Sequence, residues 1–127
     1  MLGQLLLGHL VGDYFLQNHW MAVNKVKSGW IGWIAVTIHT LLYTLSICLF
    51  TWNFDWYWIV AVFLSHIFID KYSLGKWFMN LKYKGPPFPT EKDSMHHVAL
   101  YWIIYIAIDN GAHILLMYFT YQLLYII

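Results

Sequence analysis

The sequence predicts an all-α fold, namely an integral membrane bundle of four helices in a single transmembrane domain over residues 1–127. Hydrophobic residues make up 61% of the chain and charged residues only 10%. A soluble domain carries about 25% charged residues. Four apolar stretches are each long enough to cross roughly 30 Å of hydrocarbon, which takes about 20 helical residues. We therefore expect lipid to be the solvent for most of the surface.

The first predicted helix covers residues 2–23. It starts in an apolar run and becomes polar after Leu16, which makes it the least apolar of the four. The segment lacks the basic start and the small-residue cleavage site of a secretory signal, and its apolar run already contains His9 and Asp13. We expect it to be a retained helix.

The other three predicted helices cover residues 29–52, 56–77 and 98–127. A short turn separates the second helix from the third. The third and fourth helices are joined by a loop over residues 78–97, whose three prolines make it unsuitable for a single helix. Thr90 or Ser94 is suited to cap the fourth helix, because a hydroxyl at that position accepts a hydrogen bond from a free backbone N–H group.

The lysines outside the predicted helices all fall in the first and third loops: Lys25, Lys27, Lys82, Lys84 and Lys92. Cytoplasmic loops carry an excess of positive residues, so these two loops are predicted to be cytoplasmic and both termini to face out. Aromatic residues around the second loop, such as Trp52 and Trp56, suit the opposite interface.

Composition also limits the partners. The net charge is +1 and all seven basic residues are lysines, so the chain has no arginine with which to grip phosphates in a bidentate way. We expect no nucleic-acid partner. The single cysteine, Cys48, excludes an internal disulfide. Membrane lipid is the expected partner, and assembly into a homo-oligomer remains open.

Three acidic residues lie inside the predicted helices, at Asp13, Asp70 and Asp109. A carboxylate at the centre of a membrane helix costs about 2.5 to 3.5 kcal/mol, so three without partners would cost as much as the whole stability of a typical domain. These residues must be protonated, paired or bound to a metal ion.

Each of these aspartates has a histidine four positions away, in the pairs His9 and Asp13, His66 and Asp70, and Asp109 and His113. Residues at this spacing share one face of a helix. The order within the pair is reversed in the fourth helix, which runs opposite to the first and third. All three carboxylates are therefore expected on the cytoplasmic side of their histidines.

A weak internal repeat accompanies these pairs, because Leu7-Gly8-His9 in the first helix is echoed by Leu64-Ser65-His66 in the third. The repeat suggests two helical hairpins arranged in parallel. His39 in the second helix has no carboxylate partner at this spacing, but it lies at a similar depth to the pairs. The four helices can therefore converge on one site.

Imidazoles and carboxylates on facing helices are the usual ligands of metal sites in helical bundles. The predicted ligands are His9, Asp13, His39, His66, Asp70, Asp109 and His113. Seven groups exceed the four ligands of a single zinc ion, which favours two ions bridged by a carboxylate over one. We expect one or two divalent ions, with zinc as the first choice and manganese or iron as alternatives. Gln17 and Asn110 are candidates to orient the ligands without contacting the metal.

The residues also resemble a known family. The motifs that carry the resemblance are Gly8-His9-x-x-Gly12-Asp13-Tyr14-x-Leu16-Gln17, Trp20-Met21-Ala22-x-Asn24-Lys25, His39, Ser65-His66-x-x-x-Asp70 and Asp109-x-x-x-His113. Over nearly its whole length the chain resembles the small membrane proteins of bacteria and phages catalogued as domain of unknown function 3307. This resemblance implies a location in the bacterial inner membrane.

A more distant similarity links the repeated His-x-x-x-Asp pairs to inner-membrane proteins labelled metal-dependent hydrolases. It implies hydrolysis of a lipid or lipid-linked substrate by His9, Asp13, His66 and Asp70. The Asp-then-His order of the fourth helix and the isolated His39 depart from a strict fourfold repeat.

The leading hypothesis is therefore a metal-dependent membrane hydrolase that acts on a phospholipid or a lipid-linked phosphate. A metal-bound water would be the nucleophile, and Asp13 or Asp109 would be the general base. Two other classes remain open. One is a transporter or channel for protons or divalent metal ions, and the other is a non-catalytic membrane protein whose metal site is structural.

Overall fold

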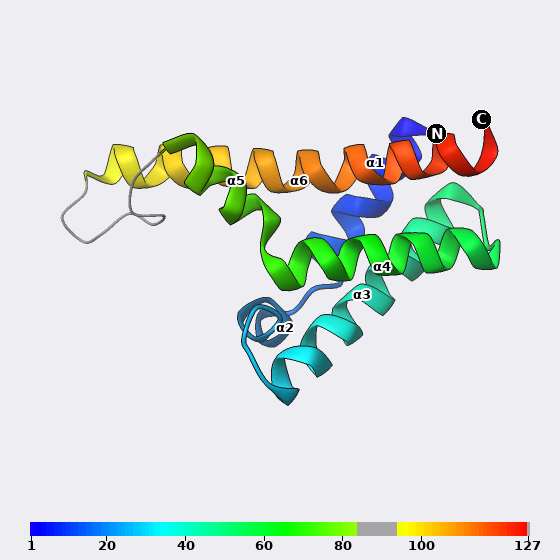
Figure 1. The fold of residues 1–127 in the computed structure, drawn as a ribbon, viewed down its shortest axis with the longest axis horizontal. Coiled ribbons are helices and arrows are strands. Elements are labelled where there is room, and N and C mark those ends of the chain that lie inside the picture. The colour runs from blue at the N-terminus through cyan, green and yellow to red at the C-terminus, as the bar shows by residue number, and fades with distance from the viewer. Residues whose placement is uncertain (84–93, 127) are drawn as a thin grey trace.

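The structure, a computed structural model, describes residues 1–83 and 94–126, and every element in this part of the chain is helical (Figure 1). The elements are α1 (Leu2–Leu10), the π-helix η1 (Val11–Phe15), α2 (His19–Asn24), α3 (Trp30–Thr51), α4 (Trp56–Tyr72), α5 (Leu74–Tyr83) and α6 (Met95–Tyr125). The prediction of an all-α protein is confirmed for the described residues.

The first predicted helix, residues 2–23, is interrupted. Helix α1 continues into the π-helix η1, and regular structure stops after Phe15. A new helix, α2, begins after Asn18, whose side chain accepts a hydrogen bond of 2.9 Å from the backbone N–H of Met21. Such a cap satisfies one of the free N–H groups at a helix start, so Asn18 favours a new helix over continuation of the old one.

Helix α3 matches the predicted second helix closely and is the centre of the fold. It contacts α1, η1, α2 and α4. Its last residue is Thr51, and the following residue, Trp52, adopts the left-handed conformation (φ 53°) that often terminates helices. The buried apolar core around α3 consists of Leu5, Tyr43, Ile47, Cys48, Trp58, Val62 and Met117.

The third predicted helix, residues 56–77, is divided into α4 and α5, which are bent by 52°. The bend occurs at Ser73, a second residue in the left-handed conformation (φ 50°). After this bend, helix α5 lies against the first half of α6 (Figure 1). The predicted loop over residues 78–97 is therefore shorter, because its first part belongs to α5 and its last part to α6.

Ser94 caps α6, as the sequence predicts for one of two candidates, by accepting a hydrogen bond of 3.4 Å from the backbone N–H of His97. The other candidate, Thr90, lies outside the described residues, as do all three prolines of the predicted loop and its lysines Lys84 and Lys92.

Two helices, α3 and α6, are long and apolar enough to cross a membrane, and the bent pair of α4 and α5 meets the same criterion as one broken span. A membrane location agrees with this finding. The start of α1 and the end of α6 lie at the same end of the molecule in Figure 1. The first helical region, divided between α1, η1 and α2, is not among the candidate spans of the described residues. The fourth crossing and the sidedness of the loops therefore stay predictions.

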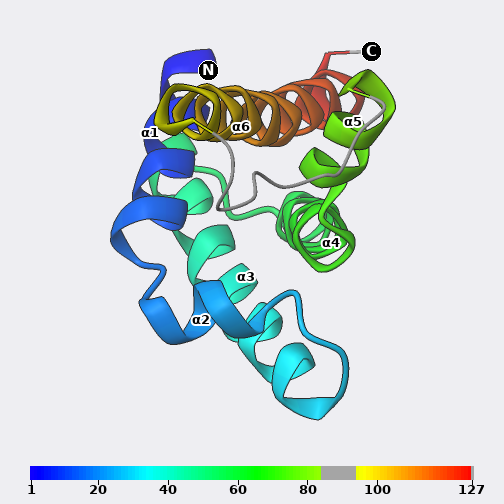
Figure 2. The same ribbon diagram turned by 90° about the vertical axis from the view of Figure 1, so that its left-hand side faces the viewer.

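Four helices surround a common centre. Helix α1 contacts α3, α3 contacts α4, α4 contacts α6, and α6 contacts α1. Figure 2 shows this arrangement almost along the axes of α4 and α6, with α1 and α3 beside them. Side chains that point inward from all four helices can meet in the middle, where the described chain shields them from its surroundings.

Candidate metal centre

The seven histidine and aspartate residues predicted from the sequence come together at this centre. The four imidazoles are at most 1% exposed. The carboxylates are less uniform, because Asp70 is buried whereas the side chains of Asp13 and Asp109 are 11% and 24% exposed. The residues come from α1 and η1 (His9, Asp13), α3 (His39), α4 (His66, Asp70) and α6 (Asp109, His113).

Three donor atoms form the tightest group, which we call the first triad: His39 Nε2, His66 Nε2 and Asp70 Oδ2. The two imidazole nitrogens lie 3.0 Å apart, and the carboxylate oxygen lies 3.0 Å from His39 and 3.3 Å from His66. Ligands of a tetrahedral zinc ion with bonds of about 2.0 Å lie roughly 3.3 Å apart. The first triad therefore has the spacing of three zinc ligands.

A second group, which we call the second triad, consists of Asp13, His66 and His113, whose donor atoms all lie within 4.8 Å of one another. His113 is oriented for ligation, because its Nδ1 lies 2.8 Å from the backbone carbonyl of Asp109. A proton on Nδ1 donated to that carbonyl leaves the lone pair of Nε2 free to face the centre. This arrangement is common among metal-binding histidines.

Two atoms of the second triad are buried without a hydrogen-bond partner among the described residues, namely Asp13 Oδ1 and His113 Nε2. A buried acceptor without a partner costs roughly 1 to 3 kcal/mol. Asp13 Oδ1 also lies 3.3 Å from His39 Nε2 and 3.5 Å from His66 Nε2, so it faces both triads. A cation bound between the members of the second triad would give Asp13 Oδ1 and His113 Nε2 a partner.

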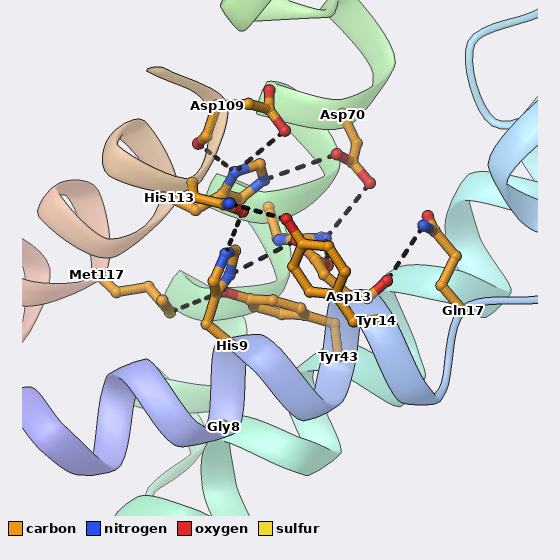
Figure 3. Close-up of polar contacts among 12 residues, drawn as sticks. Gly8, His9, Asp13, Tyr14, Gln17, Tyr43, Asp70, Asp109, His113 and Met117 are labelled. Atoms are coloured by element: carbon orange, nitrogen blue, oxygen red, sulfur yellow. Dashed lines mark hydrogen bonds and ion pairs between the residues drawn. The ribbon is translucent and has the colours of Figure 1, made fainter. Parts of the chain in front are cut away.

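His9 belongs to neither triad, although it was predicted as a ligand. Its Nε2 donates a hydrogen bond of 2.8 Å to Asn110 Oδ1, and the Tyr43 hydroxyl lies 3.0 Å from its Nδ1. Figure 3 shows His9 next to Tyr43 and beneath His113. Both nitrogens of His9 are thus occupied by protein groups, and its role as a ligand stays a prediction.

The remaining predicted residues lie around the two triads. The Asp109 carboxylate reaches within 3.9 Å of His113 Nδ1 but is in neither triad (Figure 3). Gln17 donates to the backbone carbonyl of Asp13, at 3.2 Å, and not to its carboxylate. Asn110 orients His9 and also donates to the Tyr14 hydroxyl at 2.8 Å.

Sequence reasoning missed Tyr43, a fully buried residue of α3. Its ring stacks on the His66 imidazole, with centroids 3.5 Å apart and planes inclined by 19°. This contact holds His66 in its orientation. The signal in the sequence is a hydroxyl-bearing aromatic residue one helical turn after His39, but this pattern is ordinary in a membrane helix.

Sequence reasoning also missed Lys25, which was considered only as an indicator of topology. Its Nζ lies 2.8 Å from Asp70 Oδ2, the same oxygen that belongs to the first triad. Lys25 closes the family motif in the first helical region, and that position is the signal from which its role could have been suspected.

A family model described as "Protein of unknown function (DUF3307)" matches residues 1–126. The chain belongs to this family. Membership confirms the resemblance drawn from the sequence motifs. No curated protein and no solved structure matches the chain, so the more distant similarity to metal-dependent hydrolases has no support from these comparisons.

Proposed function

We propose that this member of the DUF3307 family is a metal-dependent membrane hydrolase that uses one or two divalent ions to cleave the phosphoester of a membrane lipid. The observation that carries the proposal is the spacing of the first triad, 3.0 to 3.3 Å between its donor atoms. Zinc is the first choice of metal, because imidazole and carboxylate without thiolate suit zinc at this ligand spacing.

The chemistry follows from the ion. A bound divalent ion makes hydroxide available from water near neutral pH and polarises the phosphoryl oxygens. The water oxygen forms the new bond to phosphorus, and the phosphorus–oxygen bond to the lipid alcohol breaks. We assign the general base to Asp109, because it is the carboxylate outside both triads. It would accept the proton from water and pass it to the leaving alkoxide.

An apolar groove between α3 and α4 supports a lipid substrate. The groove has a volume of about 530 Å³ and is lined by Leu41, Thr44, Leu45, Cys48, Phe54, Ile59, Val60, Phe63 and Leu64. A groove with this lining suits an acyl chain.

Proton transfer is the second candidate function. It is favoured by the direct contact between His39 and His66, whose Nε2 atoms lie 3.0 Å apart. Linked imidazoles and carboxylates inside a membrane protein can relay protons without a metal. Absence of metal binding would leave this candidate as the function to test.

The first experiment is elemental analysis of the detergent-purified protein beside the double variant His66→Ala, Asp70→Ala. We expect about one to two equivalents of zinc, manganese or iron in the wild type and little in a double variant that still elutes as a single species. The matched control is His96→Ala, which removes an exposed histidine at the start of α6 and should retain the metal. A wild type that takes up no metal after supplementation would overturn the proposal.

Turnover is tested separately with metal-loaded protein and a panel of phospholipids and lipid-linked phosphates. Asp109→Asn should keep the metal and lose roughly 100-fold or more of the rate, the usual contribution of a general base. Equal and negligible turnover of the whole panel by wild type and Asp109→Asn would leave a metal-binding protein that is not this hydrolase.

A further inference from the structure

Lys25 brings a positive charge to the edge of the centre, although an ammonium group cannot serve as a metal ligand. Its Nζ lies 2.8 Å from Asp70 Oδ2, and the side chains of Lys25 and Asp70 are only 17% and 4% exposed. The same oxygen faces His39 and His66 in the first triad. The lysine and a metal ion would therefore share one carboxylate oxygen.

The backbone around Lys25 is held by contacts that do not involve Asp70. Lys71 on α4 donates a hydrogen bond of 2.7 Å to the carbonyl of Lys27 and a longer one of 3.5 Å to the carbonyl of Lys25 itself. The Lys71 ammonium also lies 4.7 Å from the centre of the Trp33 ring on α3. The segment that carries Lys25 is thus attached to two helices of the bundle, and its position does not depend on the ion pair.

Two cations close to one oxygen repel each other. An ion bound to Asp70 Oδ2 at about 2.0 Å would lie within about 5 Å of the lysine nitrogen. Water screens this repulsion poorly, because both side chains are mostly buried. An anion that contacts the metal ion and the ammonium together removes the conflict and adds a charge-assisted hydrogen bond.

We infer that Lys25 is an anion-binding residue of the centre, and that with the metal in place its ammonium and the ion together bind an oxyanion of the phosphate class. This inference rests on the proposed function and adds to it the residue that recognises the substrate phosphate. Lysine binds phosphate as a point charge, and its ammonium can donate a charge-assisted hydrogen bond to a phosphate oxygen.

The matched control for Lys25 is Lys27, two positions away. Its ammonium donates to Asn24 Oδ1 at 2.9 Å in an exposed contact and does not approach the centre. The experiment compares Lys25→Met with Lys27→Met as zinc-loaded proteins in detergent, with binding of inorganic phosphate measured by calorimetry. We expect Lys25→Met to bind phosphate roughly 10- to 100-fold more weakly and Lys27→Met to match the wild type within twofold.

Metal binding by the same variants separates this inference from the proposed function. Loss of Lys25 removes a competitor for Asp70, so Lys25→Met should bind zinc as tightly as the wild type or more tightly. A wild type that takes up no zinc counts against the proposed function itself. A zinc-loaded Lys25→Met that binds phosphate like the wild type overturns the inference about Lys25 alone.

A second measurement uses the wild type only and covers the case in which Lys25→Met does not fold. Reductive methylation of the zinc-loaded protein, mapped by mass spectrometry, should label Lys25 more slowly when phosphate is present, whereas Lys27 should be labelled equally in both conditions. Equal labelling of Lys25 with and without phosphate would overturn the inference.

The source of the phosphate is distinguished by competition. Short-chain phosphatidic acid that displaces inorganic phosphate at lower concentration supports a lipid phosphate. Displacement only by free phosphate supports a soluble one and still assigns the anion to Lys25. Diacylglycerol of the same chain length lacks the phosphate and should not compete, and displacement by it would contradict an anion site.

Discussion

The motifs His9-x-x-x-Asp13 and His66-x-x-x-Asp70 have the same spacing, but the structure uses them in different ways. In α4 both members face the same triad, with His66 Nε2 3.3 Å from Asp70 Oδ2. In the first motif the two side chains also approach each other, with His9 Nδ1 3.5 Å from Asp13 Oδ2, but only Asp13 belongs to a triad. His9 contacts Asn110 and Tyr43 as well.

Two physical causes distinguish these motifs. The backbone between His66 and Asp70 is regular α-helix, whereas Asp13 lies in the π-helix η1, where one carboxylate oxygen faces His9 and the other faces His39 and His66. His9 also faces an amide, Asn110, that occupies one of its nitrogens. Equal spacing along a helix therefore does not determine equal roles, and the groups on the facing helix decide which nitrogen remains free.

The largest effect is expected when the histidines of the two motifs, His66 and His9, are replaced in turn and metal binding is compared. His66→Gln should abolish stoichiometric metal binding, because His66 belongs to both triads. His9→Gln should retain the metal with affinity reduced about 10- to 100-fold, the usual effect of a residue that acts through the ligands. Zinc titration against a chromophoric chelator measures both. Equal losses in the two variants would make His9 a ligand after all.

An intermediate effect is expected at Gly12, which lies in η1 against α3. A Cβ added there would lie 2.7 Å from the Tyr43 ring and 3.2 Å from its Cα atom, so the ring that stacks on His66 must shift. We expect Gly12→Ala to destabilise the protein by about 1 to 3 kcal/mol, measured by thermal unfolding in detergent. Gly3→Ala is the control, because nothing lies within 4 Å of a Cβ at that position. A Gly12→Ala protein as stable as Gly3→Ala would show that η1 is less closely packed than described.

The smallest effect is expected at Gln17, where the only described contact is the hydrogen bond to the backbone carbonyl of Asp13. Gln17→Ala should lower stability by about 1 kcal/mol, the usual contribution of a single hydrogen bond. Its metal content should match the wild type. Loss of metal from this variant would mean that Gln17 positions the carboxylate of Asp13 and not only its backbone.

The seven polar residues could be predicted from the sequence because carboxylates are rare at bilayer depth and their histidine partners recur at helical spacing. Spacing gives the face of a helix and the depth of a residue. It does not give the rotation of one helix against another, so the contact between His9 and Asn110, 101 positions apart, was not accessible.

The breaks in the helices were harder to predict for a local reason. Asn18 begins α2 through a side-chain cap, and Ser73 ends α4 through a left-handed backbone. Asparagine and serine also occur within continuous helices, so neither residue type marks a break by itself. Lys25 was read as a topology marker, because its position near a helix end gave no indication that its side chain reaches Asp70.

The hydrogen bond between His9 and Asn110 has a consequence for biosynthesis. It joins the first helix to the last, and His113 on the same last helix contributes to the second triad. The second triad can therefore form only after α6 has been synthesised, whereas the first triad contains no residue of α6. Until then the six helical elements that precede α6 lack the polar partners that α6 supplies. If both triads contribute to the metal site, a chain that ends before α6 should retain less metal than the full-length chain.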